Sequence, residues 1–520
     1  MSDSIWSLIP PLLAILMVLL TKRVLLSLGV GIVFSALFVA NLHISETMTL
    51  IFQAFKNVFW EDGGLNTWNV YIIFFILLLG IITSFVSMMG GTRAFGDVMI
   101  RRVKTRVGAQ LMTMVLGIAL FIDDYFNSLT VGQVARPITD KHLISRSKLA
   151  YIVDSTAAPI CVIAPLSSWG AYILGLIGTV FITHNIVDYS ALGAFITMIP
   201  MNFYVWAALG VVFVTIIRQA DFGPMKKHEL HALQTGEVAY TKTSVSTEET
   251  NVSNKGKISD LLTPIIVLFI ATIGFIFGTG YLALDVSERT MINILGEADV
   301  SLSLFIGGLV AVLVTFLLFI KHVNAKELTS ADFVKGNING VKAMLSAVII
   351  LVFAWSITDL IDQLGTGTFL ADVVKNANIP FAILPVIIFI MAGIIAFSTG
   401  TSWGSFALLL PIAGQIAAST NIDLVLPMLA AVLAGAVFGD HCSPISDTTI
   451  LSSTGSSCHH IDHVTTQLPY SLVAAGIAGA GYIVLGFTES VTFGLLTVVL
   501  GLVILFFSLK KPTNSSIYME

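Results

Sequence analysis

The chain contains little charge and little cysteine. Asp, Glu, Lys and Arg make up 11% of its 520 residues, and its three cysteines are too few to form a disulfide framework. The formal net charge of −5 is small, which argues against a nucleic-acid partner. Hydrophobic residues make up 56% of the chain and the mean hydropathy is +0.92, so it is too apolar for a soluble globule. This composition predicts an all-α polytopic membrane protein.

Apolar stretches account for most of the sequence. Nine are long enough to cross about 30 Å of hydrocarbon as single helices. They lie near residues 5–21, 24–42, 70–89, 190–217, 261–284, 302–321, 343–362, 469–487 and 490–508. Two further stretches, 149–182 and 424–455, are too long for one span and too short for two. Each predicts one crossing with a broken helix, which gives about eleven transmembrane helices in total.

Lysine and arginine are missing from the predicted spans. Of the 26 basic residues, 23 fall in loops on one side, and the opposite loops hold only Lys56, Arg289 and Lys375. The positive-inside rule therefore predicts the amino terminus outside and the carboxy terminus in the cytoplasm. Basic residues flank 107–135 on both sides, so this stretch should enter and return as a re-entrant hairpin. A second hairpin is expected at about 380–420.

Two short sequence matches share one separation. Leu166–Gly170 recurs as Leu451–Gly455, and Pro159-Ile160 recurs as Pro444-Ile445, both 285 positions later. The order of helices, hairpin and broken helix is the same in both halves, but the basic residues place the hairpins on opposite sides. Inverted repeats with broken helices are typical of secondary transporters. The expected organisation is a first repeat at 1–217, a flexible cytoplasmic linker at 218–260, an inverted second repeat at 261–487, and an extra helix with a cytoplasmic tail at 488–520.

Polar segments at membrane depth are the candidate site. A carboxylate at the bilayer centre costs about 2.5 to 3.5 kcal/mol, so five of them imply a function. Sodium is a hard cation that prefers oxygen ligands. The candidate residues for binding a cation or a proton are Asp123, Asp124, Asn127, Asp154, Asp440, Ser443, Asp447 and Thr448. The candidate residues for binding a solute are Ser155, Thr156, Ser167, Ser168, Thr399, Thr401, Ser402, Ser452 and Ser453.

Several of these residues have two interpretations. Neighbouring residues on a helix point about 100° apart, so one of Asp123 and Asp124 should face the ion and the other should cap the hairpin turn. His441 is either a proton carrier or a histidine satisfied by the backbone. The run Cys458–His463 has metal-binding residue types but no second ligand set, so we expect an interfacial loop and no metal beyond Na⁺.

The motifs resemble those of a known family. Gly439-Asp440-x-x-Ser443-Pro444-x-Ser446-Asp447-Thr448-Thr449 and Asp123-Asp124-x-x-Asn127, with Asp154-Ser155-Thr156 between them, are similar to the NhaC-type sodium/proton antiporters of the ion transporter superfamily. The similarity covers roughly residues 70–490. It implies Na⁺/H⁺ exchange by alternating access in a bacterial plasma membrane. It also implies no cofactor, a lipid environment and a homodimer.

Two functions are therefore expected from the sequence. The first is a sodium/proton antiporter, in which Na⁺ and H⁺ compete for the buried carboxylates. The alternative is a sodium-coupled transporter or exchanger of a carboxylate-bearing solute, such as an amino acid or a dicarboxylate, held by hydroxyls and helix amino termini. A channel would need a continuous pore, and an enzyme would need a nucleophile and a base, which the sequence does not offer.

Overall fold

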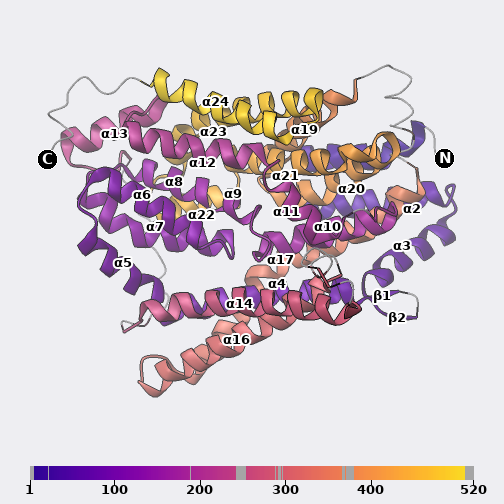
Figure 1. Ribbon diagram of the computed structural model, residues 1–520, viewed down its shortest axis with the longest axis horizontal. Helices are drawn as coiled ribbons and strands as arrows, with labels where there is room; N and C mark the ends of the chain where they lie inside the picture. Colours follow the sequence, from indigo (N-terminus) through magenta and orange to yellow (C-terminus); the bar gives the residue numbers. More distant parts are fainter. Residues whose placement is uncertain are drawn as a thin grey trace.

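The computed structural model describes residues 5–509 except 22, 62, 188, 242–252, 254, 287–288, 291–293, 295–296, 366–368 and 370–379. Regular structure in this part is helical apart from one two-stranded hairpin, formed by β1 (Trp60–Glu61) and β2 (Gly64–Leu65). Most of the long helices run side by side along the longest axis of the molecule (Figure 1). The prediction of an all-α polytopic membrane protein is confirmed.

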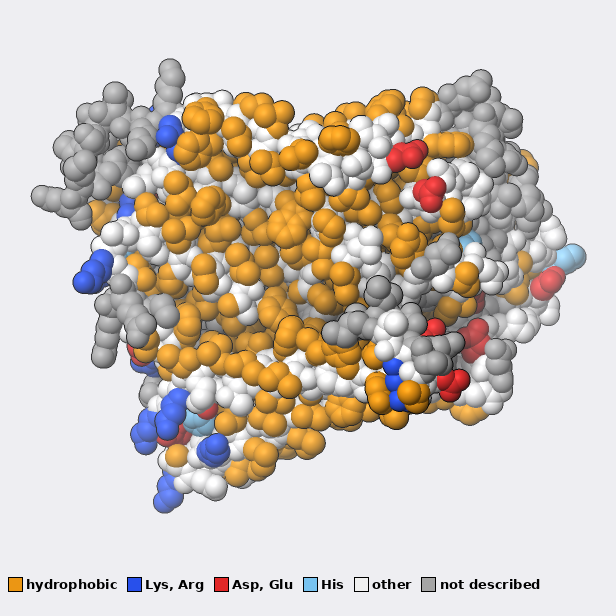
Figure 2. Space-filling view, in the orientation of Figure 1, with side chains coloured by type: hydrophobic (Ala, Val, Ile, Leu, Met, Phe, Trp, Pro, Cys, Tyr) orange, Lys and Arg blue, Asp and Glu red, His pale blue; other side chains and the backbone are white. Residues whose placement is uncertain are grey.

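Nine segments of the described residues are long and apolar enough to cross a membrane. They are Thr67–Met89, Phe203–Thr235, Ile258–Ala283, Val300–Asn324, Ser330–Ile361, Phe381–Thr399, Ile422–Cys442, His460–Thr488 and Val491–Ser508. Three further apolar helices are shorter, namely Leu25–Val39, Arg106–Ala119 and Ser168–Thr183. The surface between the two ends of the helices is largely hydrophobic on the face in Figure 2.

A bundle of long helices supports one side of the molecule. It consists of α4 (Thr67–Met89), α14 (Ile258–Ala283), α16 (Val300–Asn324) and α17 (Ser330–Gln363), which pack against one another. Helices α4 and α17 meet at Gly80 and Gly340, where a Cβ on Gly80 would lie 2.3 Å from the Gly340 carbonyl oxygen. The preceding elements are η1 (Ile5–Leu8), α1 (Ile9–Thr21), α2 (Val24–Val39) and α3 (Ile44–Phe59), and α5 (Gly91–Arg102) follows α4.

Both expected hairpins are present as pairs of helices. The first consists of α6 (Arg106–Ala119) and α7 (Asp124–Lys141), and the second of α19 (Leu384–Thr399) and α20 (Ser402–Thr420). Short 3₁₀ turns, η3 (Phe381–Ile383) and η4 (Ile422–Leu424), flank the second hairpin. Gly400 makes the second turn with a φ of +71°, a conformation that favours glycine.

Both expected broken helices are also present. In the first, α8 (Arg146–Thr156), α9 (Ala158–Cys161) and α10 (Ser168–Thr183) are separated by irregular backbone, and in the second α21 (Val425–Cys442) is followed by α22 (Asp447–Gly455). Pro159 and Pro165 lie in or beside the first break, and Pro444 lies in the second. Proline cannot donate to a helix and disfavours helical backbone in the residue before it, which accounts for both breaks. The inverted relation between the two halves stays a prediction.

Three features differ from the sequence predictions. Residues 190–217 are not one helix but α11 (Ala191–Met198) and α12 (Phe203–Arg218), because Pro200 interrupts the helix and Asn202 caps the second part. The linker at 218–260 contains a docked helix, α13 (Gly223–Thr235), while its residues 242–252 and 254 lie outside the described part. Lys148, assigned to a loop, is fully buried in α8.

Two contacts explain the docking of α13 and the burial of Lys148. Glu229 on α13 forms an ion pair with Arg106 and accepts a hydrogen bond of 2.8 Å from the backbone of Ser145. The Lys148 ammonium lies 2.6 Å from Asp221, so its charge is balanced inside the protein. The chain ends with α23 (His460–Thr488) and α24 (Val491–Ser508), and the tail beyond residue 509 lies outside the described part.

Candidate functional site

The hairpin turns and the second helix break meet at a cavity of about 570 Å³. Its polar side contains residues from three elements: Asp123, Asp124 and Tyr125 from the start of α7, Thr399, Gly400, Thr401 and Trp403 from the second hairpin, and Ile445 and Asp447 from the second break. Arg23, Leu25, Leu26, Ala343, Met344 and Ile350 line the remainder. Candidate residues from both hairpins and from the second broken helix therefore line one cavity.

Asp123 and Asp124 have different roles in this geometry. Asp123 is the amino-terminal cap of α7: it accepts a hydrogen bond of 3.0 Å from the Phe126 N–H and one of 2.9 Å from the Ser168 hydroxyl. Asp124 is 1% exposed, and its Oδ2 is buried without a hydrogen-bond partner. A buried, uncommitted carboxylate oxygen is a costly arrangement. Asp124 is therefore the better placed of the two to bind a cation.

Asp447 lies opposite, in the first turn of α22. Its Oδ2 accepts a hydrogen bond of 2.9 Å from the hydroxyl of Tyr125, which connects α22 to α7 across the cavity. The neighbouring Thr448 is buried and shares a hydrogen bond of 2.9 Å with Ser446, the residue that caps α22. Asp447 thus presents its carboxylate to the cavity while the hydroxyls around it are bonded within the protein.

Asp440 supports the site from behind the cavity wall. Its Oδ2 accepts hydrogen bonds of 3.1 Å from the backbone N–H and 2.8 Å from the hydroxyl of Ser402, and its Oδ1 accepts one from Ser446. It therefore caps α20 and fixes the second hairpin against the second break. Ser443 acts similarly by donating to the carbonyl oxygen of Phe397 at 2.7 Å.

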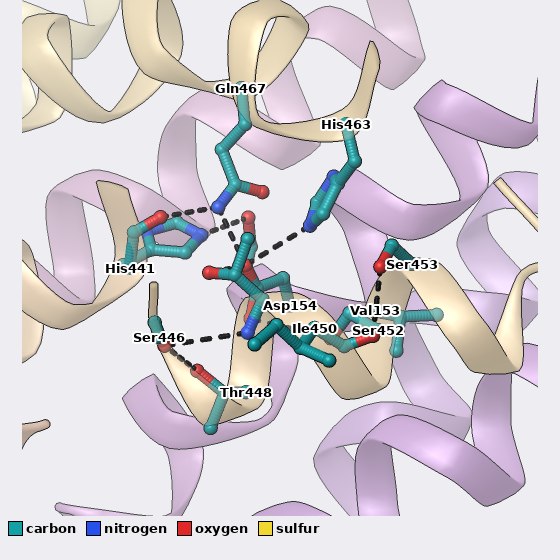
Figure 3. Close-up of polar contacts among 12 residues, drawn as sticks. Val153, Asp154, His441, Ser446, Thr448, Ile450, Ser452, Ser453, His463 and Gln467 are labelled. Atoms are coloured by element: carbon teal, nitrogen blue, oxygen red, sulfur yellow. Dashed lines mark hydrogen bonds and ion pairs between the residues drawn. The ribbon is translucent and has the colours of Figure 1, made fainter. Parts of the chain in front are cut away.

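A separate polar cluster surrounds Asp154, where α8 packs against α22 and α23. Asp154 accepts hydrogen bonds from Thr449 at 3.1 Å, Ser452 at 3.3 Å and Gln467 at 2.6 Å, and it lies 3.3 Å from His463 Nε2. Figure 3 shows His463 and Gln467 reaching toward Asp154 from α23. Asp154 is fully buried and does not line the cavity.

His441 is next to this cluster. Its Nε2 lies 3.0 Å from the Ser155 hydroxyl and its Nδ1 lies 2.7 Å from the Tyr204 hydroxyl. Both ring nitrogens are therefore paired with side-chain hydroxyls and not with the backbone, while a role as a proton carrier stays a prediction.

The other predicted residues are mostly committed to the fold. Asn127 donates to the carbonyl oxygens of Gly117, Leu120 and Thr156 and so fixes the first hairpin to the first break. Thr156, Ser167 and Ser453 each donate to backbone carbonyl oxygens. Among the candidate residues for a solute, Thr399 and Thr401 are the ones that line the cavity.

The candidate binding residues named from the sequence did not include Tyr125, Trp403, Thr449, His463 and Gln467. The interfacial loop expected at 458–463 was wrong for residues 460–463, because α23 begins at His460 and His463 has no exposed surface. One signal was available in the sequence. His463 and Gln467 are four residues apart and therefore share one face of a helix.

Comparisons with known proteins agree with this architecture. Residues 160–487 match the profile of the Na⁺/H⁺ antiporter family. The chain is 43% identical over 513 residues to an uncharacterized protein of Haemophilus influenzae, covering 98% of this chain and 96% of that protein. It is 31% identical to the malate-2H⁺/Na⁺-lactate antiporter of Bacillus subtilis over 40% of this chain and 41% of that one.

One solved structure has the same fold. The YdaH transporter of Alcanivorax borkumensis superposes with a TM-score of 0.52 at 12% identity, covering 85% of this chain and 89% of that one. The family expected from the motifs is confirmed by the profile match, which covers more than half of the chain. The chain is a multi-pass membrane transporter and belongs to the Na⁺/H⁺ antiporter family.

Proposed function

We propose that this transporter exports Na⁺ in exchange for H⁺ by alternating access. The observation that carries the proposal is the pair of carboxylates, Asp124 and Asp447, facing one cavity together with the oxygens of Thr399 and Thr401. Oxygen ligands of this kind suit a hard cation. Exposed Arg23 is the one basic residue among the lining residues described, so the carboxylates dominate the charge of the cavity.

The helix amino termini around the cavity favour a cation over a carboxylate. A free helix amino terminus attracts anions. Here Asp123 caps α7, Asp440 accepts from the first residue of α20, and serines cap α22 and α10. Since the protein's own side chains use these positions, a carboxylate-bearing solute would have to compete with them.

We further propose that α13 and the basic ends of the helices near it face the cytoplasm of a bacterial cell. Lys and Arg gather at the left end of the face in Figure 2, where α5 and α13 lie, and most of its Asp and Glu lie toward the right. This distribution agrees with the positive-inside rule and with an amino terminus outside.

A sodium-coupled solute transporter is the second candidate. The observation that favours it is the cavity volume of about 570 Å³, which is far larger than one cation and falls in the range of small-molecule sites. The Bacillus subtilis relative is a malate-2H⁺/Na⁺-lactate antiporter by name. Under this alternative the solute would occupy the space beside the cation, against Trp403 and the hydroxyl of Thr401.

Proteoliposomes containing the purified protein separate the two candidates. Under the antiporter proposal, external Na⁺ dissipates an imposed pH gradient without any organic solute, and Asp124→Asn lowers this activity by at least a hundredfold. The matched control is Asp423→Asn, which changes an exposed aspartate of η4 outside this cavity. Sodium-driven uptake of labelled malate, lactate or an amino acid, without any cation-dependent proton movement, would instead support the second candidate.

A further inference from the structure

The buried cluster around Asp154 is not explained by the cavity. It lies between α8, α22 and α23 and contains a carboxylate, an imidazole and an amide with no exposed surface beyond 1%. The cavity that holds Asp124 and Asp447 does not include any of them. Sodium binding in the cavity therefore gives no role to the Asp154 carboxylate or the His463 imidazole.

We propose that His463 and Asp154 carry the exchanged proton, at a site separate from the sodium cavity. This inference rests on the proposed function and deepens it. The sequence predicts competition between Na⁺ and H⁺ for the same carboxylates, whereas here the two ions occupy different places. The exchange would then depend on a mechanical connection between the two sites.

The hydrogen bonds of the two histidines point to His463 as the proton acceptor. Both nitrogens of His441 are paired with the hydroxyls of Ser155 and Tyr204. His463 has Nε2 at 3.3 Å from Asp154, and its Nδ1 is buried without a partner. With a proton on Nε2 donated to the carboxylate, Nδ1 has a free lone pair. A proton taken up there gives an imidazolium whose charge the Asp154 carboxylate balances.

The groups around Asp154 permit both charge states. Gln467 donates to the carboxylate through its amide nitrogen, while its Oε1 is buried without a partner. Helix α22 faces Asp154 with the neutral hydroxyls of Thr449 and Ser452. The other titratable groups near it include His441, Asp440 and Cys442 on α21 and Tyr204 on α12. Besides His463, the hydrogen-bond partners of Asp154 are thus the neutral side chains of Thr449, Ser452 and Gln467.

Helix α22 provides the connection between the two sites. Successive residues on a helix are rotated by about 100°, so Asp447 points to one side of α22 while Thr449 and Ser452 point to the other. Asp447 lines the cavity and accepts from Tyr125, whereas Thr449 and Ser452 donate to Asp154. A change of charge at the His463–Asp154 pair therefore alters the hydrogen bonds that position the helix presenting Asp447.

The test compares two transport modes of one variant. Exchange of ²²Na⁺ for Na⁺ across proteoliposomes needs the sodium cavity but no net proton movement, whereas Na⁺/H⁺ exchange needs both sites. We expect His463→Gln to lower Na⁺/H⁺ exchange at least tenfold and to leave ²²Na⁺/Na⁺ exchange within threefold of the unsubstituted protein. The matched control is His459→Gln, at the cap of the same helix, which should leave both modes unchanged.

Two results for His463→Gln would overturn the inference, and one result for the unsubstituted protein would overturn the proposed function as well. Retention of Na⁺/H⁺ exchange by His463→Gln, or an equal loss of both modes, would remove His463 from proton transport. If the unsubstituted protein moves no ²²Na⁺ in either mode, the proposed function itself fails and this inference fails with it.

A second measurement does not depend on the folding of a variant. The affinity of the unsubstituted protein for Na⁺ is measured by calorimetry in detergent from pH 5 to pH 9. Coupling between two sites is finite, so the affinity should fall with acidity and then reach a plateau. Competition for one site predicts instead a tenfold fall for every pH unit at the acidic end, and that result would overturn the inference.

Discussion

The hydroxyl of Tyr125 donates a hydrogen bond of 2.9 Å to the carboxylate of Asp447, although 322 positions separate the two residues in the chain. Tyr125 belongs to the first hairpin and Asp447 to the second broken helix. The contact therefore joins the two halves of the chain at the wall of the cavity, where a cation would be held and released.

Removal of this hydrogen bond should weaken sodium binding without destroying the site. A hydrogen bond to a charged group contributes about 1.5 to 3 kcal/mol, and the exposure of Asp447 to the cavity favours the lower value. We expect Tyr125→Phe to raise the KM for Na⁺ about tenfold, with expression unchanged. Tyr71→Phe, on α4 outside the cavity, is the control, and equal KM values for the two variants would contradict the role of Tyr125.

Gly400 should be sensitive to the smallest substitution. Its φ is +71°, and a Cβ there would lie 2.4 Å from the carbonyl oxygen of Ile445 in the second break. Gly400→Ala should therefore separate the hairpin turn from the break and lower the transport rate at least tenfold. Gly274→Ala in α14 has open space around the added carbon and should be neutral in the same assay. Similar rates for the two variants would contradict this account of the turn.

The docked helix α13 should depend on Glu229. This carboxylate is paired with Arg106 and accepts the backbone N–H of Ser145, all of them largely buried. Removal of one partner of a buried pair typically costs about 3 to 5 kcal/mol. Glu229→Ala should lower the Tm in detergent and speed proteolysis between α13 and α14. Lys227→Ala, on the exposed side of α13, should behave like the unsubstituted protein, and identical proteolysis of both variants would argue against the docking.

Glu327 should contribute stability that depends on pH. Hydrogen bonds from Ser253 and His322 lower the pKa of this glutamate below its ordinary value of 4.5. A lowered pKa means that the contribution is complete above pH 4.5 and disappears as the pH falls through the folded-state pKa. We expect Glu327→Gln to lower the Tm at pH 5, with a difference that shrinks toward pH 3. A difference that stays constant over this range would show that the charge of Glu327 is not involved.

The sequence predicted the spans and breaks because their causes are local. Runs of apolar residues, Pro159 and Pro444 act within a few positions of themselves, so they can be recognised without tertiary structure. The division of 190–217 was missed although Pro200 has the same effect, because the apolar run on both sides is long enough for one span. The docking of α13 was missed since it depends on Arg106, more than a hundred positions away.

The candidate site was predicted in its residue types more than in its geometry. Aspartates within apolar stretches can be recognised in the sequence. Whether such a carboxylate caps a helix or faces a cavity depends on its hydrogen-bond partners in the folded chain. Asp123 and Asp440 hold helix amino termini, while Asp124 faces the cavity with an unpaired oxygen. The partners of Asp154 come from α22 and α23, nearly 300 positions away or more. No local pattern marks such contacts.

In the proposed mechanism, the exchange of Na⁺ for H⁺ depends on sodium binding in the cavity that contains Asp124 and Asp447. The most direct measurement is the ratio of ²²Na⁺ efflux to proton influx in proteoliposomes of the unsubstituted protein and of Asp124→Asn. We expect both fluxes to rise and saturate together in the unsubstituted protein and both to disappear in Asp124→Asn. Sodium flux without proton flux in the unsubstituted protein, or normal exchange by Asp124→Asn, would contradict this mechanism.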